Sequence, residues 1–358
     1  MAGIKDVAKR AGVGISTVSH VINGTKRVSP ETTEKVNKAI KELDYHVDVV
    51  ARSMKSSITK RIGIVISDMC GLFFPYVAKA VYEIADKYGY SLTIYDSGCK
   101  IEQERRSIQD LVHNRADGII LSSVISMENE IEYAKNLLEI TNAGKKIPVV
   151  SIERNFAPYG IDSICTDMKL GACKAMQYLI DIGCRRIAHI SEPFSFSGRQ
   201  DAYMTVLEEN NLPQDRRFIR KGDFTHTSGY HCMKDILSQG IHLDALFAAN
   251  DQMALGACRA IKEYGLRIPE DIKVIGFDDV FVSNILEPPL STIRIEKKKL
   301  GYEAIKTLLY RMGLNIDIPF EKDLSQEPRC LHLENRLIIR KSTDINAPEE
   351  SGYSLHDW

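Results

Sequence analysis

The sequence lacks the features that mark membrane, secreted and metal-binding proteins. No apolar run among its 358 residues approaches the ~20 residues that a membrane-spanning helix needs. The N-terminus has no signal-peptide core. Eight cysteines are present, but none forms a C-x-x-C pair and none has the spacing of zinc ligands. We therefore expect a cytoplasmic protein with buried, reduced thiols and no bound metal.

Catalytic motifs are also missing. The sequence has no Walker loop, no G-x-S-x-G and no H-E-x-x-H. Asp278 and Asp279 could be read as a catalytic acid pair. Neighbours at the end of a strand point to opposite sides of the sheet, however, which argues against a shared role. The sequence therefore gives no basis for an enzyme and predicts no cofactor.

The charge of the chain is unevenly distributed. The first 60 residues hold 11 Lys and Arg against 6 Asp and Glu, a net charge of +5. The remaining residues hold 36 against 42, a net charge of −6, so the total of −1 conceals the contrast. A basic segment on an acidic body indicates that the basic segment binds nucleic acid.

Three short amphipathic helices are predicted within the basic segment. Apolar residues recur at helical spacing over 4–11 and 36–43, with a shorter stripe over 18–22. Gly12-Val13-Gly14 supplies a tight turn, because glycine adopts dihedral angles that other residues avoid. Ser29-Pro30-Glu31 is a favourable start for the third helix. Two helices joined by a short glycine turn form a helix-turn-helix.

The second helix of this motif normally lies in the major groove, where its first residues contact base edges. An ordinary solvated face is the alternative interpretation, but such a face would carry more Glu and Lys than this one does. Ile15 suits a thymine methyl group, and Ser16 and His20 suit base edges. Side chains suited to phosphate contacts are Thr17, Ser19 and Asn23.

The segment from Ile4 to Lys55 resembles the DNA-binding head and hinge of the lactose/galactose-repressor family, and over the head it is most similar to the purine-repressor branch. The similarity continues to about Lys341. It implies a repressor that binds a pseudo-palindromic operator as a homodimer, with Ile15, Ser16 and His20 as base readers. Gly14 departs from the usual capping serine, at a cost of only a few tenths of a kcal/mol.

Residues 48–56 resemble the hinge helix of the family, which orders when two chains pair on DNA. The resemblance implies that Met54 wedges between base pairs in the minor groove, a role that suits methionine. It also implies that Ala51 allows close helix approach and that Arg52 and Lys55 hold phosphates. A flexible linker is the alternative interpretation of this segment.

From Arg61 onward, short apolar runs alternate with longer amphipathic segments, a pattern typical of an α/β protein with parallel sheets. About 280 residues are too many for one core and favour two subdomains. The strands are predicted at 62–66, 92–95, 118–121, 148–152, 187–190, 218–222, 245–248 and 274–277. The helices are predicted near 76–89, 102–114, 129–142, 168–182, 199–210, 227–238, 252–264 and 297–312.

The resemblance implies a clamshell of parallel sheets flanked by helices, similar to periplasmic binding proteins. The helix near 76–89 is a candidate dimer face, and no leucine heptad in the C-terminal tail predicts a tetramer. The predicted boundaries are a head at 1–47, a hinge at 48–60, an effector and dimerisation domain at 61–341 and a flexible tail at 342–358. Within that domain the first subdomain takes about 61–160 and 291–320, and the second about 161–290 and 321–341.

Ligands of open α/β sheets bind beyond the carboxyl ends of the strands. Asp278 follows a buried strand, and a buried acid needs a partner. The alternative interpretation of Arg199 is that it serves only as an ion-pair partner between the subdomains. The alternative for Phe74 or Phe224 is that the ring only packs in the core. We expect Asp167 and Asp251 to be helix caps. The family's effector pocket maps onto Phe74, Arg199, Phe224, Asn250 and Asp278, with Phe73, Arg154 and Ser195 as additions.

The identity of the effector is predicted from the same positions. The purine-repressor branch has a second arginine where this chain has Pro193, and FAANDQMALG is similar to the sugar-responsive members. We therefore expect a monosaccharide or sugar derivative, and Arg154 and Arg199 favour a sugar acid or phosphate. The alternatives are a purine and a protein coregulator. A solute-binding protein would share the clamshell, but the basic head argues against it.

Overall fold

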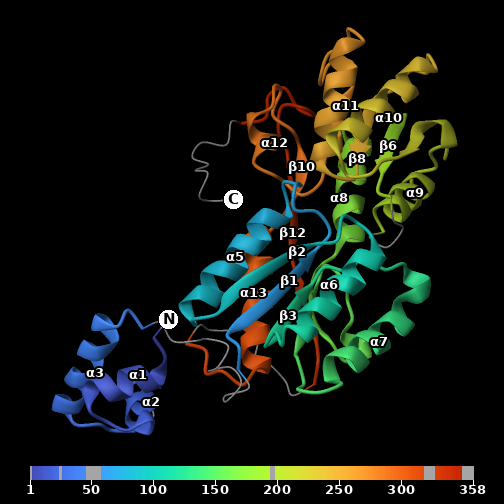
Figure 1. The fold of residues 1–358 in the computed structure, drawn as a ribbon. Helices are drawn as coiled ribbons and strands as arrows, with labels where there is room; N and C mark the ends of the chain where they lie inside the picture. Colours follow the sequence, from blue (N-terminus) through green and yellow to red (C-terminus); the bar gives the residue numbers. More distant parts are fainter. Residues whose placement is uncertain (1, 24–25, 46–57, 194–197, 318–326, 349–358) are drawn as a thin grey trace. The chain divides into compact units, whose positions relative to one another are not determined.

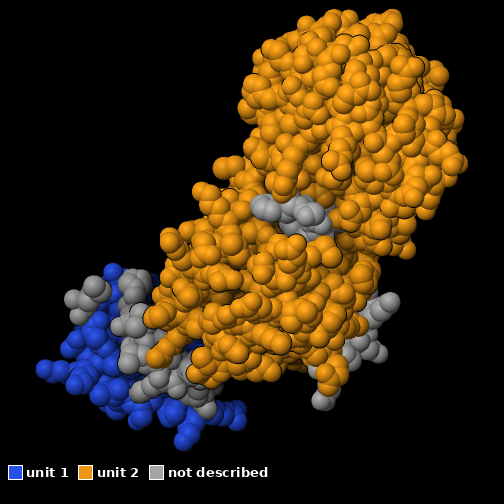
Figure 2. Space-filling model, turned by 90° about the vertical axis from the view of Figure 1, so that its right-hand side faces the viewer, with its two compact units in different colours: residues 1–59 blue, residues 60–358 orange. Residues whose placement is uncertain are grey.

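The computed structural model describes residues 2–23, 26–45, 58–193, 198–317 and 327–348. The chain divides into two compact units, residues 1–59 and 60–358, which Figure 2 shows in different colours. No helix among the described residues is both long enough and apolar enough to cross a membrane. Every cysteine is a free thiol. Only Cys165, Cys184 and Cys258 are buried, whereas Cys70 is exposed and the other four are half-buried, which corrects the expectation that all eight are buried.

The first unit is a three-helix head, as predicted. Its helices are α1 (Ile4–Ala11), α2 (Ile15–Asn23) and α3 (Pro30–Glu42). Val7, Val18 and Val36, one from each helix, are fully buried in a common core. Gly12 ends α1 at a φ of 68°, a left-handed conformation that glycine adopts without steric cost. Ser29 caps α3 by accepting a hydrogen bond from the backbone N–H of Thr32 at 3.3 Å.

The second unit contains two parallel sheets. The first sheet has the strand order β11-β5-β4-β3-β1-β2, and all of its neighbouring pairs are parallel. Helices α5 and α13 pack on the face that carries Ile62 and Ile64, while α6 and α7 pack on the face that carries Val65 (Figure 1). The strands are β1 (Arg61–Ile66), β2 (Ser91–Asp96), β3 (Gly118–Leu121), β4 (Val149–Ile152), β5 (Asp162–Thr166) and β11 (Cys330–Leu333). The helices are α5 (Phe74–Lys87), α6 (Ile101–His113), α7 (Glu130–Asn142) and α13 (Lys297–Arg311).

The second sheet has the order β7-β6-β8-β9 and is also parallel. Helices α8 and α9 pack on one face with Phe247, and α10 and α11 pack on the other with Leu246. Its strands are β6 (Ile187–Ser191), β7 (Ile219–Lys221), β8 (Ala245–Ala248) and β9 (Lys273–Ile275). Its helices are α8 (Met168–Asp181), α9 (Arg199–Glu209), α10 (His226–Ser238) and α11 (Asp251–Glu263).

Two of the predicted boundaries between the subdomains, near 160 and near 320, differ from the crossings in the structure. Strand β5 belongs to the first sheet, so the first subdomain continues to Thr166 rather than ending at 160. Strand β11 also belongs to the first sheet, so residues 330–333 are not part of the second subdomain. Two further strands that the sequence pattern did not indicate, β10 (Thr292–Ile295) and β12 (Asn335–Ile338), form an antiparallel pair beside the crossings.

Residues 342–348 pack against the second unit, which corrects the prediction of a flexible tail for that part. Ser342 and Thr343 are buried. The backbone N–H of Val274 donates to the carbonyl of Ser342 at 2.9 Å, and the Ser342 hydroxyl donates to the carbonyl of Val274 at 2.6 Å. Ser342 thus provides hydrogen-bond partners for the backbone N–H and carbonyl of Val274 at the edge of β9. A polar segment can therefore pack against the sheet. Residues 349–358 lie outside the described part.

Candidate effector cavity and DNA-reading helix

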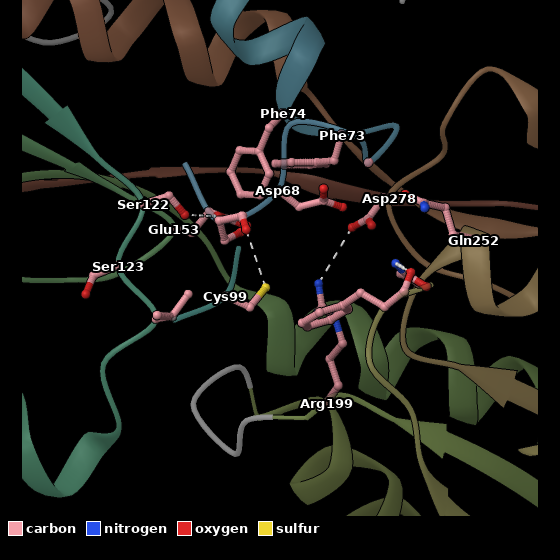
Figure 3. Close-up of a pocket in the computed structure, with 15 residues that line it drawn as sticks. Asp68, Phe73, Phe74, Cys99, Ser122, Ser123, Glu153, Arg199, Gln252 and Asp278 are labelled. Atoms are coloured by element: carbon pink, nitrogen blue, oxygen red, sulfur yellow. Dashed lines mark hydrogen bonds and ion pairs between the residues drawn. The ribbon is translucent and has the colours of Figure 1, made fainter. Parts of the chain in front are cut away.

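A cavity lies between the two subdomains, beyond the carboxyl ends of their strands, and is partly open to solvent. Figure 3 shows the side chains that converge on it. The first subdomain contributes Ser67, Asp68, Gly71, Phe73, Phe74, Cys99, Ser122, Ser123, Val124 and Glu153, and the second contributes Arg199, Phe224, Asn250, Gln252 and Asp278. This is the location that the strand-end rule for open α/β sheets predicts.

Six of the eight predicted effector contacts line this cavity: Phe73, Phe74, Arg199, Phe224, Asn250 and Asp278. Arg154 does not line it. Its guanidinium lies 3.3 Å from the carboxylate of Glu130 and 5.9 Å from the ring of Phe156. Glu153, the neighbour of Arg154, adopts a φ of 66° and faces the cavity instead. Ser195 lies outside the described residues.

Arg199 and Asp278 form a buried pair at the second-subdomain side of the cavity, marked by a dashed line in Figure 3. Their charged groups are 3.6 Å apart, and the guanidinium lies 4.4 Å from the ring centroid of Phe277. Burial raises the pKa of Asp278 well above its usual range, and the charge of Arg199 offsets only part of that rise. Asp278 therefore keeps its proton to a higher pH than an exposed aspartate does.

Glu153 is a second acid in the cavity, and it is half-buried. The Ser122 hydroxyl donates to its carboxyl at 2.7 Å (Figure 3). Burial raises the pKa of Glu153, while the hydrogen bond from Ser122 lowers it by a smaller amount. A carboxyl that stays protonated can donate a hydrogen bond as well as accept one.

Aromatic rings from both subdomains contribute to the cavity wall. Phe73 and Phe74 precede and begin α5, and their rings meet edge to face with centroids 5.1 Å apart. Phe224 comes from the second subdomain, and its φ of 70° is a conformation rarely adopted by bulky residues. Asn250 holds this segment, since its side-chain amide donates to the carbonyl of Phe224 at 3.0 Å.

Asn250 also corrects the prediction that Asp251 caps α11. The side-chain oxygen of Asn250 accepts from the backbone N–H of Met253 at 2.9 Å, so Asn250 is the cap. Asp251 is the first helical residue, and its buried carboxylate accepts hydrogen bonds from Thr292 and Ser283. The prediction was displaced by one residue because both Asn and Asp suit the capping position.

Two other predictions about aspartates are confirmed. Asp167 caps α8 by accepting from the N–H of Leu170 at 2.8 Å. Asp278 and Asp279 do point to different surroundings: Asp279 is fully buried and pairs with Arg340 at 2.8 Å and with Arg294. Only Asp278 of the two lines the cavity.

In the head, α2 carries the residues that were predicted to contact DNA. Ile15 is 45% exposed although it is apolar, Ser16 is exposed, and Val18 on the opposite side is fully buried. Thr17, Ser19 and His20 are half-buried. Asn23 is the last residue of the helix. The predicted hinge contacts Ala51, Arg52, Met54 and Lys55 lie outside the described residues.

A helix-turn-helix head followed by a two-sheet domain with a polar and aromatic cavity defines a DNA-binding regulator with an effector domain. Residues 3–48 match the family model for bacterial regulatory proteins of the lacI family. Residues 176–343 match the model for a periplasmic binding protein-like domain.

Relatives match nearly the whole chain. The transcriptional repressor PurR of Pasteurella multocida is 35% identical over 350 residues, which covers 96% of this chain and 98% of that protein. PurR of Histophilus somni is also 35% identical and covers the same share of this chain and 99% of its own length. The chain therefore belongs to the lacI family. It is a DNA-binding transcriptional repressor and not an enzyme.

Solved structures agree with this assignment. The lac repressor dimer bound to operator and an anti-inducer superposes with a TM-score of 0.82 at 28% identity, covering 96% of this chain and 99% of that chain. The complex of the transcriptional regulator CelR with cellobiose gives a TM-score of 0.66 at 29% identity and covers 96% of this chain and 100% of that chain.

Proposed function

We propose that a purine base binding in the cavity controls this repressor. The observation that carries the proposal is the combination of aromatic rings from both subdomains with the Arg199–Asp278 pair and the Glu153 carboxyl in one cavity. The 35% identity to PurR repressors over nearly the whole chain supports a purine over the sugar that the sequence pattern favours.

The chemistry of the cavity suits a flat heterocycle. Aromatic side chains such as Phe74 and Phe224 offer faces on which a planar ring can stack. The edge of an oxopurine carries alternating N–H donors and carbonyl or ring-nitrogen acceptors. The guanidinium of Arg199 donates to such acceptors, and the carboxyls of Asp278 and Glu153 accept from the donors.

A sugar derivative is the second candidate, and two observations favour it. Pro193 occupies the position where the purine-repressor branch has a second arginine. The CelR structure, which is similar in fold at 29% identity, contains cellobiose. An anionic sugar is less well supported, because Arg154 pairs with Glu130 away from the cavity and three carboxyls line it.

We further propose that the repressor acts as a homodimer on a pseudo-palindromic operator. Each head would read one half-site through Ile15, Ser16 and His20, with Met54 as the minor-groove wedge. Apolar side chains exposed on the second unit support pairing. Tyr82 on α5 is 52% exposed, and Ile94 on the edge strand β2 is 38% exposed. Phosphate contacts should make binding fall steeply with salt.

Effector and operator then influence each other by linkage. The effector changes operator affinity if it binds more tightly to a protein conformation with one closure angle of the subdomains than to another. The operator then changes effector affinity by the same factor. A coupling of about 1–3 kcal/mol corresponds to roughly a 5–150-fold change in affinity.

The test is a binding screen with the full chain. Hypoxanthine, guanine, adenine, cellobiose, glucose and gluconate are each titrated by calorimetry and by thermal shift. A ligand at 100 times its Kd adds about 2.7 kcal/mol to the free energy of unfolding. Binding of a purine base with no response to the sugars supports the proposal. Binding of a sugar alone would transfer the assignment to the second candidate, and no binding by either class would overturn the small-molecule effector proposed here.

A further inference from the structure

One hydrogen bond joins the two subdomains at the edge of the cavity. The backbone N–H of Leu72 donates to the side-chain oxygen of Gln252 at 2.8 Å. Leu72 lies in the loop between β1 and α5 of the first subdomain, and Gln252 is the second residue of α11 in the second subdomain. Figure 3 shows Gln252 on the second-subdomain side of the cavity that it helps to line.

Side-chain hydrogen bonds hold the loop of residues 67–72, which belongs to no strand or helix. The N–H of Cys70 donates to Asp68 at 2.8 Å, and the N–H of Met69 donates to Asp96 at 3.1 Å. Both of these acceptors belong to the first subdomain. The N–H of Leu72 therefore differs from its neighbours, because its acceptor belongs to the other subdomain.

Gly71 makes the close approach possible. A Cβ atom at this position would lie 2.6 Å from a carboxylate oxygen of Asp68 and 3.3 Å from the side-chain oxygen of Gln252. A larger residue would therefore require the Asp68 carboxylate to shift and would crowd the side chain of Gln252.

The helix that carries Gln252 is a firm support. Asp251, the residue before Gln252, is fully buried and accepts hydrogen bonds from Thr292, Ser283 and the backbone N–H of Val280. Asn250 caps the same turn. The residues on either side of Gln252 are thus held by hydrogen bonds, Asp251 through its carboxylate and Met253 through its N–H to Asn250. The side chain of Gln252 therefore extends from a fixed backbone and can hold the loop in place.

The loop leads directly into the aromatic wall. Phe73 and Phe74 follow Leu72 without an intervening residue and line the cavity. A shift of Leu72 would move both rings.

We infer that Gln252 is a positioning residue, whose amide oxygen holds the 67–72 loop across the cleft so that Phe73 and Phe74 stand in position for the effector. The inference about affinity rests on the proposed function of the cavity, while the loop contact itself is independent of which effector binds.

The experiment compares Gln252→Met, which keeps the length of the side chain but loses the acceptor, with Gln252→Glu, which keeps an acceptor oxygen. Gln239→Met is the matched control, since Gln239 is exposed at the end of α10 and does not line the cavity. Amide hydrogen exchange of the peptide covering residues 68–74 is measured on the full chain without ligand. Hypoxanthine affinity is then measured for the same proteins.

We expect faster exchange at Leu72 in Gln252→Met, near wild-type exchange in Gln252→Glu and no change in Gln239→Met. Hypoxanthine affinity should fall about tenfold in Gln252→Met, since an unsatisfied N–H and a lost hydrogen bond both penalise the bound loop. Gln252→Glu should restore most of it.

Unchanged exchange at Leu72 in Gln252→Met would overturn the inference. So would faster exchange with unchanged affinity, or an equal loss of affinity in the Met and Glu variants, which would mean that the amide contacts the ligand directly. If the wild-type protein binds none of the purines or sugars, the proposed effector fails, and the exchange data alone decide whether Gln252 holds the loop.

Discussion

Arg199 and Asp278 face each other across 3.6 Å in the effector cavity, both buried and contributed by separate elements of the second subdomain. Arg199 is the first residue of α9, and Asp278 follows β9 with a φ of 102°. Their separation exceeds the ~2.7–2.9 Å of a charge-assisted hydrogen bond, so they are not locked into a bidentate pair. The pair combines the strongest donor group of the cavity with an acid of raised pKa.

Replacing Arg199 with alanine should weaken effector binding at least tenfold. The variant removes a guanidinium donor and leaves the buried Asp278 without its opposing charge. Isothermal titration with the purine that binds the wild-type protein provides the measurement. Arg217→Ala is the control, because Arg217 is exposed, pairs with Asp215 and does not line the cavity. An affinity of Arg199→Ala equal to that of the wild type would remove Arg199 from the binding site.

The buried acids should make the protein less stable as pH rises. Burial raises the pKa of Asp278 and Glu153, and it raises the pKa of Asp251 to about 6. A carboxyl with a higher pKa in the folded state binds more protons when folded than when unfolded. Its favourable contribution to stability is therefore present at low pH and is lost as pH rises from the unfolded pKa through the folded one.

Asp278→Asn tests this pH dependence, because asparagine has a similar shape and does not titrate. Melting temperatures are measured from pH 5 to pH 8 for the wild type and the variant. We expect Tm of the wild type to decline over this range more steeply than Tm of Asp278→Asn. Parallel pH profiles would show that Asp278 does not titrate differently in the folded state.

His20→Ala should relax base preference at one position of each operator half-site. A specific base contact is worth about 1–3 kcal/mol of discrimination, whereas loss of a phosphate contact weakens all sequences alike. Binding to an operator and to its single-base variants at one fixed salt concentration distinguishes these cases. A uniform loss of affinity across the variants would assign His20 to the backbone and not to the bases.

Gly256→Ala should lower the free energy of unfolding of the second unit. The decrease should be several times as large as that caused by an ordinary surface substitution. Helices α10 and α11 approach so closely that a Cβ at Gly256 would lie 1.9 Å from the carbonyl oxygen of His226. Overpacking of this kind typically costs about 1–3 kcal/mol. Gly144→Ala is the control, because a Cβ there meets nothing within 4 Å. Urea unfolding measures both, and equal stability of the two variants would contradict the close packing.

The local pattern of the sequence was sufficient for the longer helices of the second unit, but it did not indicate the short helix α12 (Val282–Ile285). Each of the eight helices predicted in the second unit is present, with ends within two residues of the prediction. Their apolar periodicity and their caps, such as Asp167, depend on residues close in sequence. The two strands missed in the first sheet lack a continuous apolar run. Asp162 and Ser163 begin β5, and His332 interrupts β11.

Those two strands also depend on distant partners. Asp162 pairs with Arg311, and β11 pairs in parallel with β5 although they are more than 160 residues apart in the chain. The packing of Ser342 against β9 is of the same kind. No local periodicity encodes these contacts, so they could not be predicted from the sequence pattern.

The candidate site divides in a similar way. Residues directly after a strand, such as Asn250 and Asp278, follow from the strand-end rule. The same rule also indicates Glu153, but the prediction took its neighbour Arg154, and the rule would have indicated Ser122 as well. Gln252 could not be found, because its partner is a backbone N–H 180 residues away in the sequence.

The most direct test of the account is the affinity of the full chain for its operator with and without a purine base, measured by fluorescence anisotropy at one salt concentration. We predict a shift of roughly 5–150-fold in operator affinity with saturating hypoxanthine or guanine and the same factor in the reciprocal titration. In Arg199→Ala the shift should require a purine concentration at least tenfold higher. Operator binding that is unaffected by purine bases, or that responds to a sugar instead, would contradict purine control of this repressor.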